Sequence, residues 1–196
     1  MESLDDKIKR VTQEEFNIVP YNFNWPKMFE EEKYYLLSCL PSSLIKRIEH
    51  FGSTSIPDMV AKPIIDILVE VTSLDDTKQR IVPILESQGY DYFWRPSFGD
   101  DIPPFYAWFI KRDQNRIRTH HIHMIEHDFT EFWDRLLFRD YLIEFHYVAE
   151  EYKNLKLSLV DRFNNDRVKY TEMKNNFITE ITQQAVTYYS EHRSYK

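Results

Sequence analysis

The sequence predicts an α+β fold, in which a mixed sheet with flanking helices is followed by a C-terminal helical part. Two observations carry this prediction. Short apolar runs rich in branched and aromatic residues lie between residues 44 and 126, and such runs are typical of strands. From residue 130 to residue 189, apolar residues recur instead at helical spacing. Strands gathered ahead of helices favour an α+β domain over an alternating α/β one.

The chain has 196 residues, a length that suits one domain with a substantial hydrophobic core. Residues 1–15 are highly charged, and we expect this N-terminus to be frayed. Residues 16–192 are expected to form the single domain. Within it, we expect a mixed α/β core to about residue 127 and a helical part over about residues 128–192.

Charge and cysteine content exclude several classes of protein. The 25 basic and 32 acidic residues give a net charge of −7, whereas binding to a nucleic-acid backbone needs clustered Lys and Arg. We therefore expect no general nucleic-acid partner, although a local basic patch fits this composition. Cys39 is the only cysteine, which excludes an internal disulfide and a cysteine zinc site. No long apolar run or secretory segment is present, so we expect a cytoplasmic protein without a membrane partner.

The first predicted elements lead into a central stretch of the chain. A helix is expected from Asn24 to just before Pro41, because Pro26 suits a first helical turn and apolar residues follow at helical spacing. Two strands are then expected over Leu44–Phe51 and Ile64–Val71. Between them lies a small polar turn, Gly52-Ser53-Thr54-Ser55, and a short loop.

The later elements are bounded by residues that start or end helices and turns. Ser73 with Asp76 resembles a capping arrangement at a helix start, and Gly89 suits the end of that helix. We then expect strands at Tyr90–Arg95, Phe105–Lys111 and Ile117–Glu126, with a loop at Pro96–Pro104. Helices are expected over Thr130–Ile143, Tyr147–Phe163 and Thr171–Tyr189.

Asp66 is the first candidate functional residue. It lies inside the apolar run Ile64–Val71, which is typical of a strand buried on both faces. A carboxylate in such surroundings costs several kcal/mol unless a metal, a cation or hydrogen-bond donors compensate it. The same carboxylate can also be a structural contact, held by N–H groups of the turn or by Lys62.

Several motifs resemble the signature of the GrpB family. They are His50–Pro57 (HFGSTSIP), Ala61–Ile67 (AKPIIDI), Arg118–His123 (RTHHIH), Phe138–Leu142 (FRDYL), Tyr152–Lys156 (YKNLK), and Tyr170-Thr171 with Lys174, Phe177 and Ile178. The resemblance covers about residues 16–190. It implies a fold similar to the nucleotidyltransferase (polymerase-β-like) superfamily, and members also occur fused to dephospho-CoA kinases. The sequence departs from the family at Asp58, where Gly is usual, and at Phe145-His146, where His-Pro is frequent.

The resemblance implies roles for the turn and for Asp66. Nucleotidyltransferases place a Gly-Ser turn after the first strand, and its N–H groups and hydroxyl hold phosphates. An Asp-x-Asp pair on the next strand holds two metal ions. Asp66 matches the first acid, but Leu68 stands at the second position. Glu70 lies on the same strand face about 13 Å away, at about 3.3 Å per residue, which is too far for a shared metal pair.

His121 and His123 are the candidate partners of Asp66. They alternate onto one face of a predicted strand, while His120 and Ile122 take the other face. Two imidazoles and one carboxylate are typical of a transition-metal site more than of Mg²⁺, which prefers oxygen. The expected cofactor is thus a divalent ion, Mg²⁺, Mn²⁺ or Zn²⁺. Imidazoles can instead serve as acid–base groups or bind phosphate, so Asp66, His121 and His123 are candidate catalytic residues as well.

A second group of residues is expected to bind substrate or phosphate. The group combines the polar turn with basic side chains at motif positions or around the predicted turn at residues 112–115: Gly52, Ser53, Thr54, Ser55, Lys62, Arg112, Arg118 and Lys174. Each has a plainer interpretation, as a tight turn, a solvated hairpin or helix packing.

Three functions fit these residues. The first is a metal-dependent nucleotidyltransferase that acts on an NTP and a small acceptor. The second, favoured by Leu68 at the second-acid position, is a non-catalytic module that binds a nucleotide or another phosphorylated ligand. The third is a single-metal phosphohydrolase. In each case the expected partner is a small phosphorylated molecule, and the sequence says nothing of oligomeric state.

Overall fold

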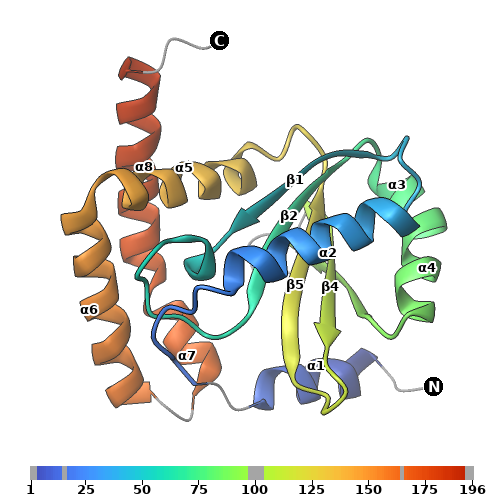
Figure 1. Ribbon diagram of the computed structural model, residues 1–196, viewed down its shortest axis with the longest axis horizontal. Helices are drawn as coiled ribbons and strands as arrows, with labels where there is room; N and C mark the ends of the chain where they lie inside the picture. The colour runs from blue at the N-terminus through green and yellow to red at the C-terminus, as the bar shows by residue number, and fades with distance from the viewer. Residues whose placement is uncertain (1–3, 15–16, 97–103, 164–165, 193–196) are drawn as a thin grey trace.

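The computed structural model describes residues 4–14, 17–96, 104–163 and 166–192. It contains an α+β fold built on a five-stranded mixed sheet with the order β1-β2-β5-β4-β3, flanked by helices (Figure 1). Only β2 and β5 pair in parallel, and the other neighbours are antiparallel. The strands are β1 Ile45–Phe51, β2 Ile65–Val71, β3 Asp91–Pro96, β4 Phe105–Arg112 and β5 Arg118–Ile125. The predicted α+β class and all five predicted strands are confirmed.

The two faces of the sheet have different roles. One face buries Ile65, Ile67 and Val69 against α2 (Trp25–Cys39), in a core that also includes the helical segment before β3. The opposite face carries Asp66, His121 and His123. There Leu68 packs with aromatic residues and with α5 (Thr130–Glu144) in a second, smaller core. Strand β2 is therefore buried on both faces, as its composition predicts, and Asp66 lies at its start.

Helix α2 follows the sequence prediction closely. It begins after Asn24, with Pro26 in its first turn, and ends at Cys39 two residues before Pro41. Proline suits a first turn because its missing N–H has no helical acceptor there. Trp25, Phe29 and Leu36 are buried against the sheet, and Figure 1 shows the helix lying across one face.

The predicted helix after Ser73 is divided into three parts. These are α3 Leu74–Asp76, a π-helical turn η2 Thr77–Ile81, and α4 Val82–Ser87. The Ser73 hydroxyl accepts a hydrogen bond from Asp76 N at 3.1 Å, which confirms the predicted cap. Pro83 has no N–H to continue the α-helical ladder, and the wider π turn precedes it. Gly89 ends the segment with φ +87°.

The C-terminal part is helical, with one correction to its expected divisions. Helices α5 and α6 (His146–Phe163) match the predictions, and α6 starts at the position where the family frequently has proline. The expected continuous helix over Thr171–Tyr189 is wrong: α7 Arg167–Glu172 ends before α8 Asn175–His192 begins. Tyr170 on α7 is buried in the cavity wall beside Lys62, whereas α8 buries Ala185 against α5 and α6. One straight helix does not place Tyr170 and Ala185 against their two separate packing surfaces.

The N-terminus is the second correction. Residues 4–13 form helix α1 (Leu4–Gln13) instead of a frayed end, while residues 1–3 and 15–16 lie outside the described part. Arg10 pairs with Asp91 at 3.1 Å, and Glu14 pairs with Arg112 at 2.6 Å and also with Arg118. Charged residues that suggest fraying are here ion-pair partners across the chain, and they hold α1 beside β4 and β5 (Figure 1).

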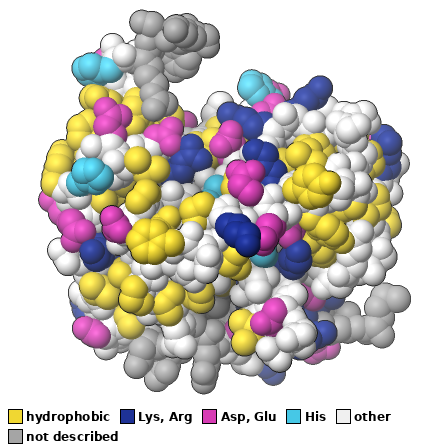
Figure 2. Space-filling model, in the orientation of Figure 1, with side chains coloured by type: hydrophobic (Ala, Val, Ile, Leu, Met, Phe, Trp, Pro, Cys, Tyr) yellow, Lys and Arg dark blue, Asp and Glu magenta, His cyan; other side chains and the backbone are white. Residues whose placement is uncertain are grey.

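The remaining expectations concern membrane-spanning helices, the distribution of surface charge and one predicted loop. Within the described residues, no helix is both long enough and apolar enough to cross a bilayer. Acidic and basic side chains are interspersed in a central band of the face shown in Figure 2, with apolar side chains on both sides. Most of the expected loop at Pro96–Pro104 falls on residues 97–103, outside the described residues.

Candidate metal centre

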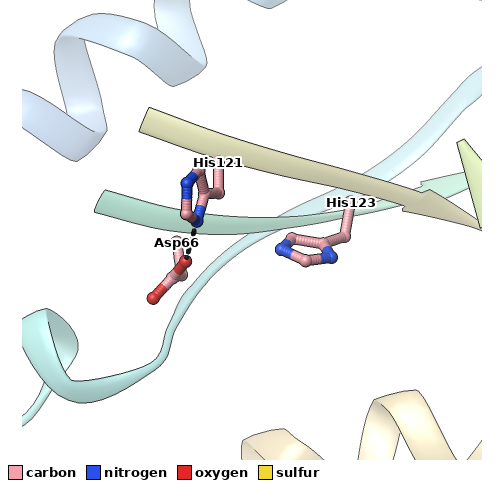
Figure 3. A group of neighbouring side chains, drawn as sticks. All are labelled: Asp66, His121 and His123. Atoms are coloured by element: carbon pink, nitrogen blue, oxygen red, sulfur yellow. Dashed lines mark hydrogen bonds and ion pairs between the residues drawn. The ribbon is translucent and has the colours of Figure 1, made fainter. Parts of the chain in front are cut away.

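Asp66, His121 and His123 converge on the site-bearing face of the sheet. The parallel register of β2 and β5 places Asp66 opposite His121, and strand alternation brings His123 onto the same face. One donor atom from each residue lies within 4.8 Å of the other two. His121 Nδ1 is 3.1 Å from Asp66 Oδ1, and one ring nitrogen of His123 points toward this pair (Figure 3). The predicted three-residue cluster is thus brought together.

Gly52 makes room for the Asp66 carboxylate. Its backbone has φ +71° and ψ −176°, a combination open essentially to glycine alone. A Cβ atom at this position would stand 2.4 Å from Asp66 Oδ2. The residues that follow form a 3₁₀ turn, η1 Ser53–Ser55, in which Ser55 Oγ donates to Gly52 O at 2.6 Å. The turn is therefore shaped around the acid.

His50 and Thr54 tie this turn to β2. Thr54 Oγ donates to Ile64 O at 3.2 Å, so it accepts from His50 Nε2 at 3.0 Å. The His50 ring stacks on Phe29 at 4.9 Å. Burial lowers the pKa of His50 to about 4, which keeps the ring neutral near pH 7. Thr54, a predicted phosphate ligand, therefore has its hydroxyl engaged inside the fold.

The backbone conformation at Asp58 explains why the family usually has glycine at this position. Its φ is +60°, in the left-handed region where non-glycine residues are uncommon. Glycine adopts that conformation without strain, and Asp is among the residues that tolerate it best. The backbone of the loop after the turn thus accounts for the usual Gly.

The electrostatics of the cluster favour an ionised acid at Asp66 and a neutral ring at His123. Burial acts to raise the pKa of Asp66, but the hydrogen bond from His121 and nearby histidine charges outweigh it and lower the pKa overall. Burial lowers the pKa of His123 well below its ordinary value, and the charges of Arg135 and Arg95 lower it further. A carboxylate next to a neutral imidazole is the protonation state that binds a metal ion.

A cavity of about 480 Å³ opens beside the cluster, and Asp66 and His121 lie in its wall. Of the other predicted site residues, five line the same cavity: Ser53, Thr54, Lys62, Arg118 and Lys174. Gly52 and Ser55 shape the turn beneath it. The side chain of the buried Tyr152 on α6 reaches Ser53, which places this helix beside the turn.

Lysines gather at the part of the cavity next to α7. Lys62 and Lys174 each lie 4.7 Å from the centre of the Tyr170 ring, and Lys62 Nζ is 3.5 Å from Thr171 Oγ. Lys156 is 1% exposed and donates to Val60 O. Burial, with the charge of Lys174, lowers the Lys156 pKa well below its ordinary value.

The two predicted arginines are held by helix α1. Arg118 lines the cavity, but its guanidinium donates to Glu14 and to Val11 O. Arg112 is outside the cavity lining; it pairs with Glu14 at 2.6 Å and with Asp91 at 2.9 Å. Burial acts to raise the pKa of Glu14, but the hydrogen bonds from both arginines outweigh it and lower the pKa.

Sequence reasoning missed residues that reach the cavity from distant strands and from helix α1. Trp108 and Arg95 line it, together with Val11 and Thr12 of α1. Trp108 lies opposite His123 in the β4–β5 pairing. No motif marks these residues, because their approach depends on strand pairing. Glu70, in contrast, pairs with Arg47 at 3.4 Å and with His127, away from the cluster as its spacing predicts.

Comparisons with known proteins agree on one family. The family model described as GrpB protein matches residues 15–184. The chain is 36% identical over 171 residues to the glutamate-rich protein GrpB of Alkalihalophilus pseudofirmus, covering 87% of this chain and 96% of that one. It is 35% identical over 168 residues to the UPF0157 protein YqkA of Bacillus subtilis, covering 86% of this chain and 46% of that longer protein.

A solved structure matches the fold as well. The crystal structure of a conserved protein GrpB from Enterococcus faecalis has a TM-score of 0.76 and 34% sequence identity. The match covers 88% of this chain and 99% of that chain. Sheet, flanking helices and C-terminal helix thus have a counterpart in a solved relative.

Proposed function

This chain belongs to the GrpB family, and we propose that it is a metal-dependent enzyme of the nucleotidyltransferase type, with one divalent ion held by Asp66, His121 and His123. The convergence of these donors beside the Gly52–Ser53 turn carries the proposal. A glycine-serine turn followed by an acid on the next strand is the arrangement implied by the resemblance to nucleotidyltransferases. The cavity next to it is the proposed place for a phosphorylated substrate.

The donor set fits a single transition-metal ion. Two ligand atoms at about 2.1 Å from one ion lie at most about 4.2 Å apart. The three donor atoms lie within 4.8 Å of one another, so side-chain movements below about 1 Å bring them to the spacing that one ion requires. Two nitrogens and one carboxylate favour Zn²⁺ or Mn²⁺ over Mg²⁺. Such an ion supplies Lewis-acid polarisation of a phosphoryl oxygen when it is bound.

The protein's own groups position the substrate in this proposal. Ser53 and the N–H groups of its turn hold a phosphate, and Lys62 and Lys174 neutralise negative charge in the cavity. An acceptor hydroxyl oxygen forms the new bond to the α-phosphorus and releases its proton to solvent. The bond between the α-phosphorus and the bridging oxygen breaks, and pyrophosphate leaves.

A second candidate is a non-catalytic module that binds the same phosphorylated ligand. Leu68 favours it: the side chain is fully buried and packs in the smaller core where nucleotidyltransferases keep a second acid. On this alternative the turn and the lysines bind phosphate, and no bond is broken. Release of products separates the two candidates.

Calorimetric titration with Zn²⁺, Mn²⁺ and Mg²⁺ is the first test. We expect one site in the wild type, and at least tenfold weaker binding in Asp66→Asn and His123→Gln. His120→Gln is the matched control, because His120 is also buried but lies on the opposite face of β5. Equal metal affinity in all four proteins would overturn the proposed centre.

Product analysis then assigns the reaction. The metal-loaded protein is incubated with each NTP and a panel of small hydroxyl and amine acceptors. Metal-dependent release of pyrophosphate that is lost in Asp66→Asn supports nucleotidyl transfer. Release of inorganic phosphate without an acceptor would indicate a phosphohydrolase instead, and NTP binding without turnover would indicate the binding module.

A further inference from the structure

Two arginines outside the motifs reach the site-bearing face. Arg95 on β3 is exposed and lines the cavity, and Arg135 on α5 is half-buried. Within the described part of the chain, neither guanidinium has a carboxylate within ion-pair distance or a hydrogen bond to protein. Arg112 and Arg118, by comparison, are both paired with Glu14. With respect to the described residues, Arg95 and Arg135 thus have donors left for another group.

A layer of aromatic rings holds both guanidinium groups beside the metal centre. Arg95 lies 5.2 Å from the centre of the Trp108 ring, which itself contacts the His121 ring at 5.2 Å. Arg135 lies 4.0 Å over the Phe132 ring. Phe132 packs 4.8 Å from Tyr106, and Tyr106 stacks on His123 at 5.4 Å. We call Tyr106, Trp108 and Phe132 the aromatic layer.

The strand register explains why Arg95 faces the site. Arg95 pairs with Tyr106 across β3 and β4, and Trp108 pairs with His123 across β4 and β5. Directly paired residues share a face, and residues two apart on a strand do as well. Arg95 therefore projects on the same face as His123, from the far edge of the sheet.

Electrostatic coupling agrees with this placement. After burial, the charge of Arg135 is among the influences that lower the His123 pKa, and Arg95 acts in the same direction. Burial raises the Tyr106 pKa, and the same two arginines oppose that rise. Both positive charges are therefore felt at the metal centre, although no acid on the described part pairs with them.

We propose that Arg95 and Arg135 form an anion subsite that holds the distal phosphates of a di- or triphosphate ligand beside the metal centre. Guanidinium forks bind phosphate oxygens bidentately, and stacking on aromatic rings preorganises them. Lys62 and Lys174 line the cavity from other segments of the chain, before β2 and after α7. A ligand that meets both groups carries several negative charges, as a polyphosphate chain does. The ligand's place next to the metal rests on the proposed function, whereas anion binding by the two arginines does not.

Inorganic pyrophosphate and tripolyphosphate are the probes, titrated calorimetrically in EDTA and again with Zn²⁺ or Mn²⁺. We expect Arg95→Gln and Arg135→Gln each to weaken binding about tenfold or more, and Arg135→Lys to weaken it less. Arg47→Gln is the matched control: Arg47 stacks 4.0 Å over Trp133, like the two subsite arginines, but pairs with Glu70 away from the cavity. Urea denaturation verifies that each variant is folded.

The outcomes separate this inference from the proposed function. Unchanged pyrophosphate affinity in both Gln variants, or no binding by the wild type under any condition, overturns the subsite. Loss of affinity equal to that of Arg47→Gln also overturns it, because the effect is then one of general charge. If no metal binds but pyrophosphate binding still depends on Arg95 and Arg135, the metal centre fails and the subsite stands.

Discussion

Gly52 and Asp66 are in contact in a way that leaves no space for a side chain. A Cβ atom on Gly52 would lie 2.4 Å from Asp66 Oδ2, far inside van der Waals distance. The turn and the acid come from two paired strands, since Phe51 lies opposite Asp66 in the β1–β2 register. The glycine of the Gly-Ser turn therefore shapes the candidate metal centre directly, in addition to its role in the turn.

Replacing Gly52 tests this contact. Gly52→Ala is expected to destabilise the fold by about 2–3 kcal/mol, because a non-glycine residue is strained at that backbone conformation. It should also weaken metal binding, because Asp66 has to move. Gly89→Ala is the control, with φ +87° and no atom within 4 Å of the added Cβ. Equal metal affinity in the two variants would contradict the role assigned to Gly52.

Glu14 is expected to hold helix α1 in place. Glu14→Gln removes the charge that faces Arg112 and Arg118, whose side chains are only 8% and 4% exposed. Loss of that buried pairing should cost about 2 kcal/mol and raise amide hydrogen exchange within α1. Glu31→Gln serves as the control, because its pair with Lys27 is exposed and should matter by less than about 0.5 kcal/mol. Unchanged exchange in α1 would show that other contacts hold the helix.

Because burial lowers the pKa of His50, we expect the protein to lose stability on acidification. Its folded-state pKa of about 4 is below the ordinary value of 6.5, so the unfolded chain binds more protons between these values. Stability should therefore fall as the pH drops from about 6.5 toward 4, by roughly 3 kcal/mol from this residue. Urea unfolding of wild type and His50→Gln across that range measures the difference. Identical pH slopes for both proteins would contradict the buried neutral ring.

Leu68 is expected to act through packing alone. Leu68→Ala should destabilise the protein by about 3 kcal/mol, as truncations of fully buried leucines do. Its metal affinity should stay within about twofold of wild type, because the side chain belongs to the smaller core and not to the donor set. Chemical denaturation and metal titration on the same samples check both parts. Lost metal binding in a stably folded variant would place residue 68 in the site.

Local patterns account for most of the elements that sequence reasoning predicted. Short apolar runs rich in branched and aromatic residues locate the five strands, Pro26 locates the start of α2, and the Ser73 side chain caps α3 as its spacing indicates. Each of these signals depends on residues a few positions apart, because helix capping and strand alternation are local properties of the backbone. The face shared by His121 and His123 follows from the same alternation.

The failures come from contacts between distant segments. Helix α1 is stabilised by Glu14, whose partner Arg118 lies 104 residues further along the chain. The break between α7 and α8 follows from two packing surfaces, one at the cavity wall and one on α5 and α6, that only the assembled fold provides. Propensity does not report on such contacts, since tertiary packing overrides it.

By itself, the sequence determined the α+β class, the glycine-serine turn, the acid that follows it and the pair of alternating histidines. Only the tertiary structure decided which strands are neighbours. The parallel register of β2 and β5 brings Asp66 to His121, and the order β5-β4-β3 brings Trp108 and Arg95 to the same site. The alternation of side chains along a strand is determined by a few neighbouring residues. The order of strands in the sheet depends instead on burying both sheet faces at once, which is a property of the whole chain.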